Sequence, residues 1–237
     1  MDNGFRHTVV RGRADTQSLD MGLRTYMLKV YNYMAIGLGL TGVVAMLVAS
    51  SPTMLTAIFG SPLKWVVMLA PLAMVFFISF RIHAISAATA QALFWIYAAL
   101  VGLSLSSIFL AYTGASIAKV FFITAGTFAA MSLYGYTTKR DLSQFGSFLI
   151  MGLIGVILAS IVNIFLKSSG LEFVISLLGV LIFVGLTAYD TQQIKSVYYE
   201  DDHPEIGAKK AITGALTLYL DFLNLFLYLL RFMGDRR

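Results

Sequence analysis

The sequence predicts an all-α membrane protein with seven transmembrane helices, and two observations lead to that fold class. Of its 237 residues, 58% are hydrophobic and only 12% are Asp, Glu, Lys or Arg, about half the roughly 25% charge of an average soluble protein. Seven spans of about 20 residues would occupy about 140 residues and leave enough for short connections. This composition excludes an ordinary water-soluble domain and predicts one compact polytopic domain.

Charged residues divide the chain into apolar intervals, and these intervals give the spans in order. The first two are residues 30–63 and 65–80, which contain no charged side chain. Residues 82–118 are too many for one span and too few for two spans with a turn. They therefore hold one helix and its linkers, and the helix stops at the polar cluster 113–116. The remaining spans are residues 120–138, 142–166, 173–189 and 211–230.

The chain divides into three parts: a polar segment of residues 1–29, a transmembrane domain of residues 30–232 and a basic tail of residues 233–237. The first part is too long and too mixed in charge for the n-region of a signal peptide. We therefore expect the first transmembrane helix to be uncleaved.

Glycines within the predicted spans are expected to let neighbouring helices approach closely, because they carry no side chain. They are Gly37, Gly39, Gly42, Gly152 and Gly155. Their predicted role is packing and not chemistry.

The distribution of positive charge predicts a cytoplasmic N-terminus. With the N-terminus inside, 11 of the 17 Lys and Arg residues fall in inner segments and 6 in outer segments, as the positive-inside rule favours. The same excess explains the net charge of +5 without nucleic acid as a partner. Half of the outer charges lie near the chain end, so a re-entrant last segment that returns the tail to the inside is the alternative.

Two acids lie within the spans, Asp190 at the end of the sixth and Asp221 in the middle of the seventh. An ionisable group at membrane depth costs several kcal/mol unless it is paired or hydrated, so each is a functional candidate. Helical spacing places Asp221 on one face of its helix with other polar residues, and this face should line a polar pathway inside the bundle. The other members of the face are Thr213, Thr217, Asn224, Tyr228 and Arg231.

Contact between Asp190 and Asp221 would make a pH sensor, because two carboxyl groups in a low-dielectric site share one proton more readily than both ionise. Counting from Ala211 places Asp221 about 15 Å into its span. Asp190 lies toward the cytoplasmic end, so contact requires tilt or a later start of the seventh helix. Arg81 ends the second helix at the level of Asp190, which permits a salt bridge. The alternative is that each aspartate caps a neighbouring helix or binds a hydroxyl group.

Two motifs resemble the closing signature of the Bax inhibitor-1 family, in its bacterial YccA-like branch. They are Thr187-Ala-Tyr-Asp190-Thr-Gln-Gln-Ile-Lys195 and Leu218-Tyr-Leu-Asp221-Phe-Leu-Asn224-Leu-Phe. Residues 132–143 are similar to that branch as well. The resemblance covers nearly all of the chain after its polar N-terminal segment.

This resemblance implies seven helices, with the last one wrapped by the other six, and a pH-sensitive calcium leak across the bacterial inner membrane. It also implies that Asp190 and Asp221 sense protons and that Arg81 latches the closed state. One type of bacterial member carries an acid in the second helix that pairs with this arginine, whereas residues 65–80 contain none. Bacterial relatives also modulate a membrane-bound quality-control protease, a role that needs no pore.

Other functional classes find little support in the residues. The chain has no cysteine, which excludes disulfides and thiolate metal sites. P-loop, H-E-x-x-H and G-x-S-x-G motifs are absent, and the residues before Asp221 lack the glycines of intramembrane aspartyl proteases. The acidic loop 200–205 has no EF-hand spacing and is expected to be a solvated turn. We expect no enzyme and no bound cofactor.

Together with the resemblance, the residues predict a calcium leak channel gated by Asp190 and Asp221. Calcium would bind these aspartates transiently as the transported ion, and Thr217, Asn224 and Tyr228 would line its pathway. The expected partners are the lipid bilayer, calcium and protons. The alternative is a non-conducting protein that modulates a membrane protease through its polar N-terminal segment.

Overall fold

The computed structural model describes the backbone of residues 4–237 and the side chains of residues 21–237. Over this range the chain forms nine helices and no strand beyond one isolated bridge, which confirms the all-α class. Seven helices are long and apolar enough to cross a membrane. The helices are α1 Gly4–Ala49, α2 Pro52–Phe59, α3 Leu63–Arg81, α4 Ala87–Leu105, α5 Ile108–Ala111, α6 Gly114–Thr137, α7 Ser143–Leu166, α8 Ser169–Ser196 and α9 Pro204–Met233.

Several helices extend past the spans predicted from charge, because backbone hydrogen bonding continues where the side chains become polar. The helix α8 runs on to Ser196, and α9 already begins at Pro204, where proline is favoured because its missing N–H needs no partner. The polar residues 4–29 belong to the same continuous helix as the first span. The Thr113 side chain accepts a hydrogen bond from Ser116 N and starts α6 within the predicted polar cluster.

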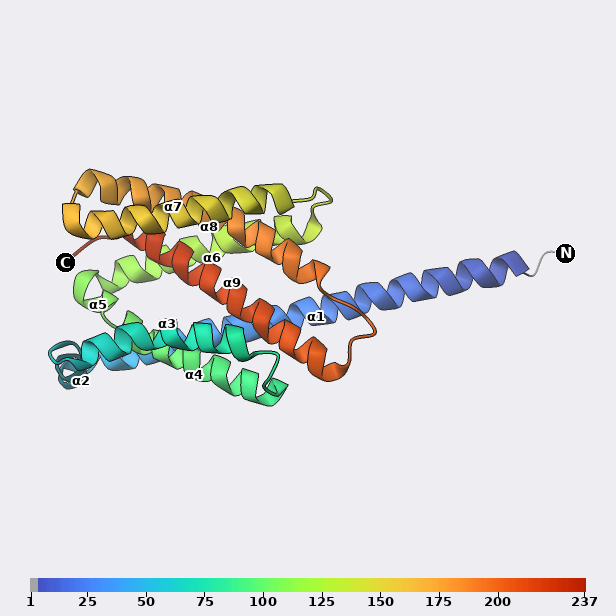
Figure 1. Cartoon of the computed structure of the whole chain (residues 1–237), viewed down its shortest axis with the longest axis horizontal. Helices are drawn as coiled ribbons and strands as arrows, with labels where there is room; N and C mark the ends of the chain where they lie inside the picture. Colours follow the sequence, from blue (N-terminus) through green and yellow to red (C-terminus); the bar gives the residue numbers. More distant parts are fainter. Residues whose placement is uncertain (1–3) are drawn as a thin grey trace.

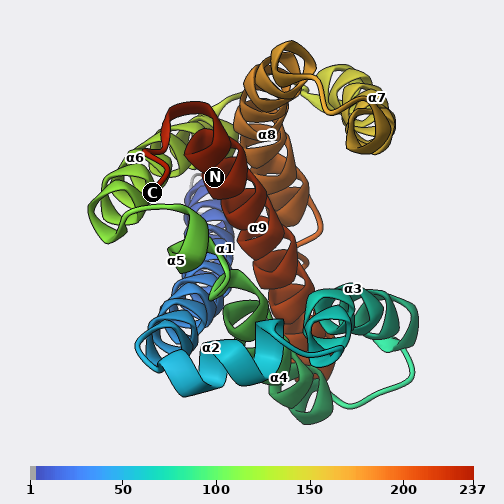
Figure 2. The ribbon, with the colours of Figure 1, turned by 90° about the vertical axis from the view of Figure 1, so that its left-hand side faces the viewer.

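The last helix, α9, occupies the middle of the bundle (Figure 2). It packs directly against α8, α1, α6 and α4, while α3 packs against α4 and α7 against α8. Of the most apolar 18 residues of each helix, 67% are buried in α9 but only 11% in α3 and in α7. The predicted central position of the seventh span is therefore confirmed, with α3 and α7 as the outermost helices.

The two chain ends lie at opposite ends of the bundle, as an odd number of spans requires (Figure 1). Because α9 is one continuous helix from Pro204 to Met233, the alternative of a re-entrant last segment is wrong. The tail folds back over the loop between α5 and α6, where Arg237 N donates a hydrogen bond to Ala111 O at 3.0 Å. The Arg236 guanidinium binds Glu172 at 2.7 Å, and this hydrogen bond raises the pKa of Arg236.

Glycine allows α6 and α8 to approach closely at Gly135, where an added Cβ would overlap the backbone of Ala188. Another close contact is between α8 and α9, where a Cβ on Gly179 would overlap the Tyr228 ring. Of the five glycines predicted to allow close approach, Gly37 and Gly152 do face a neighbouring side chain. The prediction is wrong for the other three, which face open space. They are Gly39, Gly42 and Gly155.

Candidate functional site

The packing of α8 against α9 determines how the two predicted aspartates meet. A Cβ on Gly214 of α9 would touch Ile194 of α8, close to the last residue of α8, so the turns of α9 before Gly214 extend past the end of its neighbour. From this contact, Asp190 lies about 6 Å further along α8 and Asp221 about 10 Å further along α9. Because the two helices are antiparallel, both displacements lead in the same direction. The later effective start of the seventh span therefore brings the aspartates to nearly the same level.

The side chains of Asp190 and Asp221 lie against each other, close enough to form a hydrogen bond when one of them carries a proton. Asp221 is only 5% exposed, and with both groups ionised its Oδ2 has no hydrogen-bond donor among the described residues. An ionised carboxylate is only an acceptor, so a bond between two carboxyl groups requires a proton on one of them. Such a contact is suited to an acid pair that shares a proton.

A cavity of about 550 Å³ leads to this pair from the end of the bundle that carries the N-terminus. Asp190 lines the cavity and Asp221 does not, so Asp190 lies between its partner and the cavity. The walls come from α1, the turn after α3, the end of α8 and the first half of α9. Besides Asp190, they are formed by Tyr26, Ile82, His83, Gln193, Ile194, Val197, Ile206, Lys209, Lys210, Thr213, Gly214 and Thr217.

The two lysines of the cavity wall are paired with acids. Lys209 lies 3.6 Å from Glu205, and Lys210 binds Asp202. These pairs offset the positive charge that would otherwise repel a cation at the mouth. Two acids of the turn predicted to be solvated, Asp202 and Glu205, thus form ion pairs with lysines. Among the residues described there is no cluster of three or more His, Cys, Asp or Glu that could hold a metal ion.

The predicted polar face of α9 lines the cavity only in its first part. Thr217 is a wall residue, and its hydroxyl donates to Thr213 O. Beyond Asp221, Asn224 donates its amide to Leu220 O within its own helix. Tyr228 is stacked on Phe183 of α8 with ring centroids 5.8 Å apart. Beyond Asp221, Asn224 and Tyr228 are thus engaged in helix and ring contacts and do not line this cavity.

Arg81 lies beside the mouth of the cavity but is not paired with Asp190. It is the exposed last residue of α3, and the next two residues, Ile82 and His83, line the cavity. The ion pairs of the described part of the chain do not include one between Arg81 and Asp190. The structure thus brings together the two predicted acids and leaves the predicted latch apart from them.

Two features near the aspartates were not predicted. Tyr26 of α1 is 8% exposed, lines the cavity and has a hydroxyl group with no hydrogen-bond partner among the described residues. A chain of hydroxyl groups links α1, α6 and α8, with Tyr31 2.6 Å from Ser132 and Ser132 2.9 Å from Thr191. Ser132 stands between the apolar Met131 and Leu133, which could signal a buried contact, but this does not identify the partner.

Comparison with known proteins agrees with this architecture. Residues 23–237 match the family described as Inhibitor of apoptosis-promoting Bax1. An uncharacterized protein of Rickettsia prowazekii is 53% identical over 221 residues, 93% of this chain and 94% of its own. The inner membrane protein YbhL of Escherichia coli is 52% identical over 219 residues, 91% of this chain and 94% of its own. An uncharacterized membrane protein of Streptococcus pyogenes is 39% identical over 92% of this chain and 96% of its own. With its seven apolar helices and this match over nearly its whole length, the chain belongs to the Bax inhibitor-1 family.

Proposed function

We propose that this protein is a pH-sensitive calcium leak channel of the bacterial inner membrane, gated by Asp190 and Asp221. The observation that carries the proposal is a buried carboxyl pair at the end of a cavity that opens at one end of the bundle. Carboxylate oxygens are the ligands that calcium prefers, and the cavity offers a hydrated approach to them. Calcium is a passing ion in this proposal and not a bound cofactor.

The shared proton is the gate. While it is present, it joins α8 to α9 at the aspartates. Its loss leaves two buried negative charges, which at about 4 Å and an effective dielectric constant of 20 repel each other by about 4 kcal/mol. That is enough to shift a two-state equilibrium about a thousandfold. Separation of the two helices would release the Tyr228 and Phe183 stack beyond the pair and continue the path past Asn224.

Arg81 has a secondary role in this mechanism. Its position beside the cavity mouth allows the guanidinium to move toward Asp190 when that group is ionised, which would favour closure by supplying the opposite charge. In the conformation described, Arg81 does not form an ion pair with Asp190. Closure here is therefore assigned to the shared proton and to packing, with Arg81 as a latch in a second closed state.

The proposed location in the inner membrane, with a cytoplasmic N-terminus, rests on one relative and on the distribution of positive charge. The Escherichia coli relative is an inner membrane protein, and the excess of Lys and Arg in one set of loops favours a cytoplasmic N-terminus. The cavity, which opens at the end of the bundle that carries the N-terminus, would then face the cytoplasm.

Calcium flux into proteoliposomes tests this proposal. The purified full-length chain should raise the calcium influx above that of empty liposomes, with a flux that increases between pH 6 and pH 8. Vesicles with an impermeant dye inside report the influx, and an unrelated seven-helix protein gives the background. No flux above background at any pH would show that the protein does not conduct.

A second function is favoured by the first helix. The backbone of α1 continues well beyond the bundle at the N-terminal end (Figure 1), where it offers a contact surface outside the membrane domain. In this alternative the protein restrains a membrane-bound quality-control protease without conducting. Deletion of residues 2–20 should then abolish the restraint on the protease, whereas intact restraint after this deletion would contradict the alternative.

A further inference from the structure

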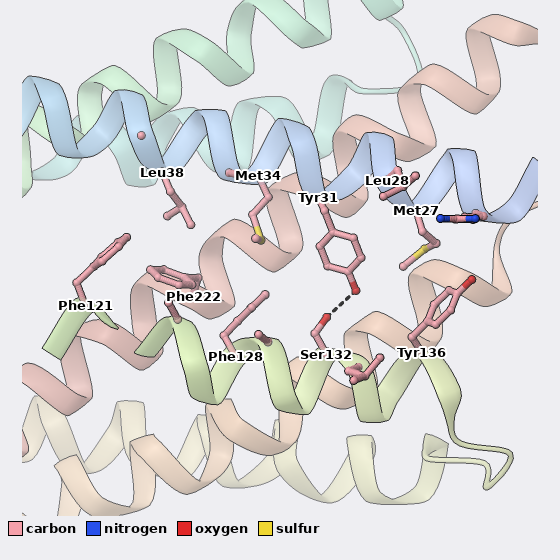
Figure 3. Close-up of a pocket in the computed structure, with 16 residues that line it drawn as sticks. Met27, Leu28, Tyr31, Met34, Leu38, Phe121, Phe128, Ser132, Tyr136 and Phe222 are labelled. Atoms are coloured by element: carbon pink, nitrogen blue, oxygen red, sulfur yellow. Dashed lines mark hydrogen bonds between the residues drawn. The ribbon is translucent and has the colours of Figure 1, made fainter. Parts of the chain in front are cut away.

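A second, larger space lies between α1 and α6 and shares no lining residue with the cavity at Asp190. It has a volume of about 770 Å³, within the range of sites that hold small molecules. Figure 3 shows side chains from the two helices facing each other across it, with Phe222 of α9 behind them. The lining residues are Arg24, Met27, Leu28, Tyr31, Met34, Ala35, Leu38, Gly39, Phe121, Ala125, Phe128, Ala129, Ser132, Leu133, Tyr136 and Phe222.

This space, the α1–α6 groove, has a closed floor and an open side. Met27 and Phe128 at the floor are 3% and 4% exposed, whereas Leu28 and Leu133 at the rim are 52% and 63% exposed. A hydrogen bond between Tyr31 and Ser132 joins the two helices across the groove (Figure 3), and Ser132 is itself buried. The groove therefore opens sideways, toward the lipid, along two helices that are both long and apolar enough to span the membrane.

The size of the groove favours a flexible chain over another helix. Along α1 it extends from Arg24 to Gly39, about 22 Å at 1.5 Å per residue. A helix about 10 Å across and of that length would occupy roughly 1,700 Å³, more than twice the 770 Å³ present. At hydrocarbon depth water is excluded, so the narrow occupant that the surroundings supply is an acyl chain.

Charge at one end of the groove selects the lipid. Among the described residues that line it, Arg24 alone is charged, and it lies one turn before Leu28 at the end that Tyr136 also borders. Lys195 lies next to this end, where its Nζ donates to Tyr136 O at 2.9 Å. Two cations beside the mouth of an apolar groove complement a lipid with a net negative head group, and arginine binds phosphate through two parallel hydrogen bonds.

We propose that the α1–α6 groove is a binding site for one anionic phospholipid, with an acyl chain along the groove and the phosphate at Arg24. The site is separate from the cavity at Asp190, so its occupancy does not depend on whether the protein conducts calcium.

Native mass spectrometry of the full-length chain in detergent, titrated with phosphatidylglycerol or phosphatidylcholine, tests the site. The wild type should bind one phosphatidylglycerol more tightly than phosphatidylcholine. Gly39→Phe should lose this lipid, because Gly39 lines the groove, a Cβ there meets no atom within 4 Å, and the ring would occupy part of the groove. The matched control is Gly42→Phe, on the same helix, also facing open space but not lining the groove, which should bind like the wild type.

Substitutions at Arg24 test how the groove recognises the lipid head group. Arg24→Gln should reduce the preference for phosphatidylglycerol about fivefold, the effect of one basic residue near an anionic lipid surface, and Arg24→Lys should keep most of it. Lys29→Gln, which removes an exposed charge of the same helix outside the groove, should change nothing. Equal binding of both lipids by the wild type, or the same bound lipid in Gly39→Phe, would overturn the proposal. An unchanged preference in Arg24→Gln would overturn the role of Arg24 in selecting the head group.

Discussion

The side chain of Asp221 lies against that of Asp190, and of the two only Asp190 lines the cavity at the N-terminal end of the bundle. In the proposed mechanism, a proton that leaves the pair for this cavity passes Asp190. This order of the two groups would tie the closed packing of α8 on α9 to the pH on one side of the membrane.

Charge at the cavity mouth should control calcium entry. Glu205→Gln removes the partner of Lys209 and leaves a positive charge beside the entrance, so we expect the calcium flux to fall about two- to fivefold at low salt. The effect should nearly vanish at 1 M salt, where charges about 3 Å apart are already screened. The double variant Glu205→Gln/Lys209→Gln should restore the flux. Equal loss at low and high salt would argue against an electrostatic effect.

The contact of α6 with α8 should tolerate no side chain at Gly135. Gly135→Ala would force the Ala188 backbone away, and we expect it to lower the free energy of unfolding by about 1–3 kcal/mol, as overpacking does. Gly155→Ala faces open space and should be neutral or slightly stabilising, because alanine favours the helix. Unfolding in mixed micelles measures both. Equal stability of the two variants would mean that the helices are further apart than described.

The hydroxyl chain between α1, α6 and α8 should contribute to stability. Ser132→Ala removes the partner of Tyr31 and leaves that hydroxyl without its bond, at an expected cost of about 1–3 kcal/mol. Adding Tyr31→Phe to Ser132→Ala should recover part of this loss, because the Tyr31 hydroxyl that had lost its partner is then removed. The same unfolding experiment compares the single and double variants, and strictly additive losses would show that the two residues do not interact.

Topology can be measured by thiol labelling, because the chain has no native cysteine. With a cytoplasmic N-terminus, Asp201→Cys between α8 and α9 should react with an impermeant maleimide only from the cytoplasmic side. Asp235→Cys in the tail should react only from the opposite side. Right-side-out and inverted vesicles distinguish the two cases. Labelling of both positions from the same side would contradict seven spans, and exchanged sides would reverse the orientation.

The spans could be predicted from the sequence because charged residues mark where apolar helices leave the lipid. The helix register could not, since it depends on Ile194 packing against Gly214, and neither residue stands out in its own segment. Counting from the first residue of the predicted span therefore placed Asp221 deeper in the membrane than Asp190, so that contact required tilt or a later start of the helix. The close contact of α6 with α8 involves Gly135, which was not among the glycines predicted to allow close approach. The α1–α6 groove also escapes prediction, because it requires the positions of two helices that are far apart in sequence.

The most direct test of the account is the pH dependence of calcium flux in Asp190→Asn and Asp221→Asn, measured in proteoliposomes from pH 6 to pH 8. Asparagine donates a hydrogen bond as a protonated carboxyl does but cannot ionise, so both variants should show a low flux that does not change with pH. Asp141→Asn, an exposed acid of the loop between α6 and α7, should keep the rise of the wild type. If Asp190→Asn and Asp221→Asn retain the wild-type pH profile, the aspartate pair is not the sensor.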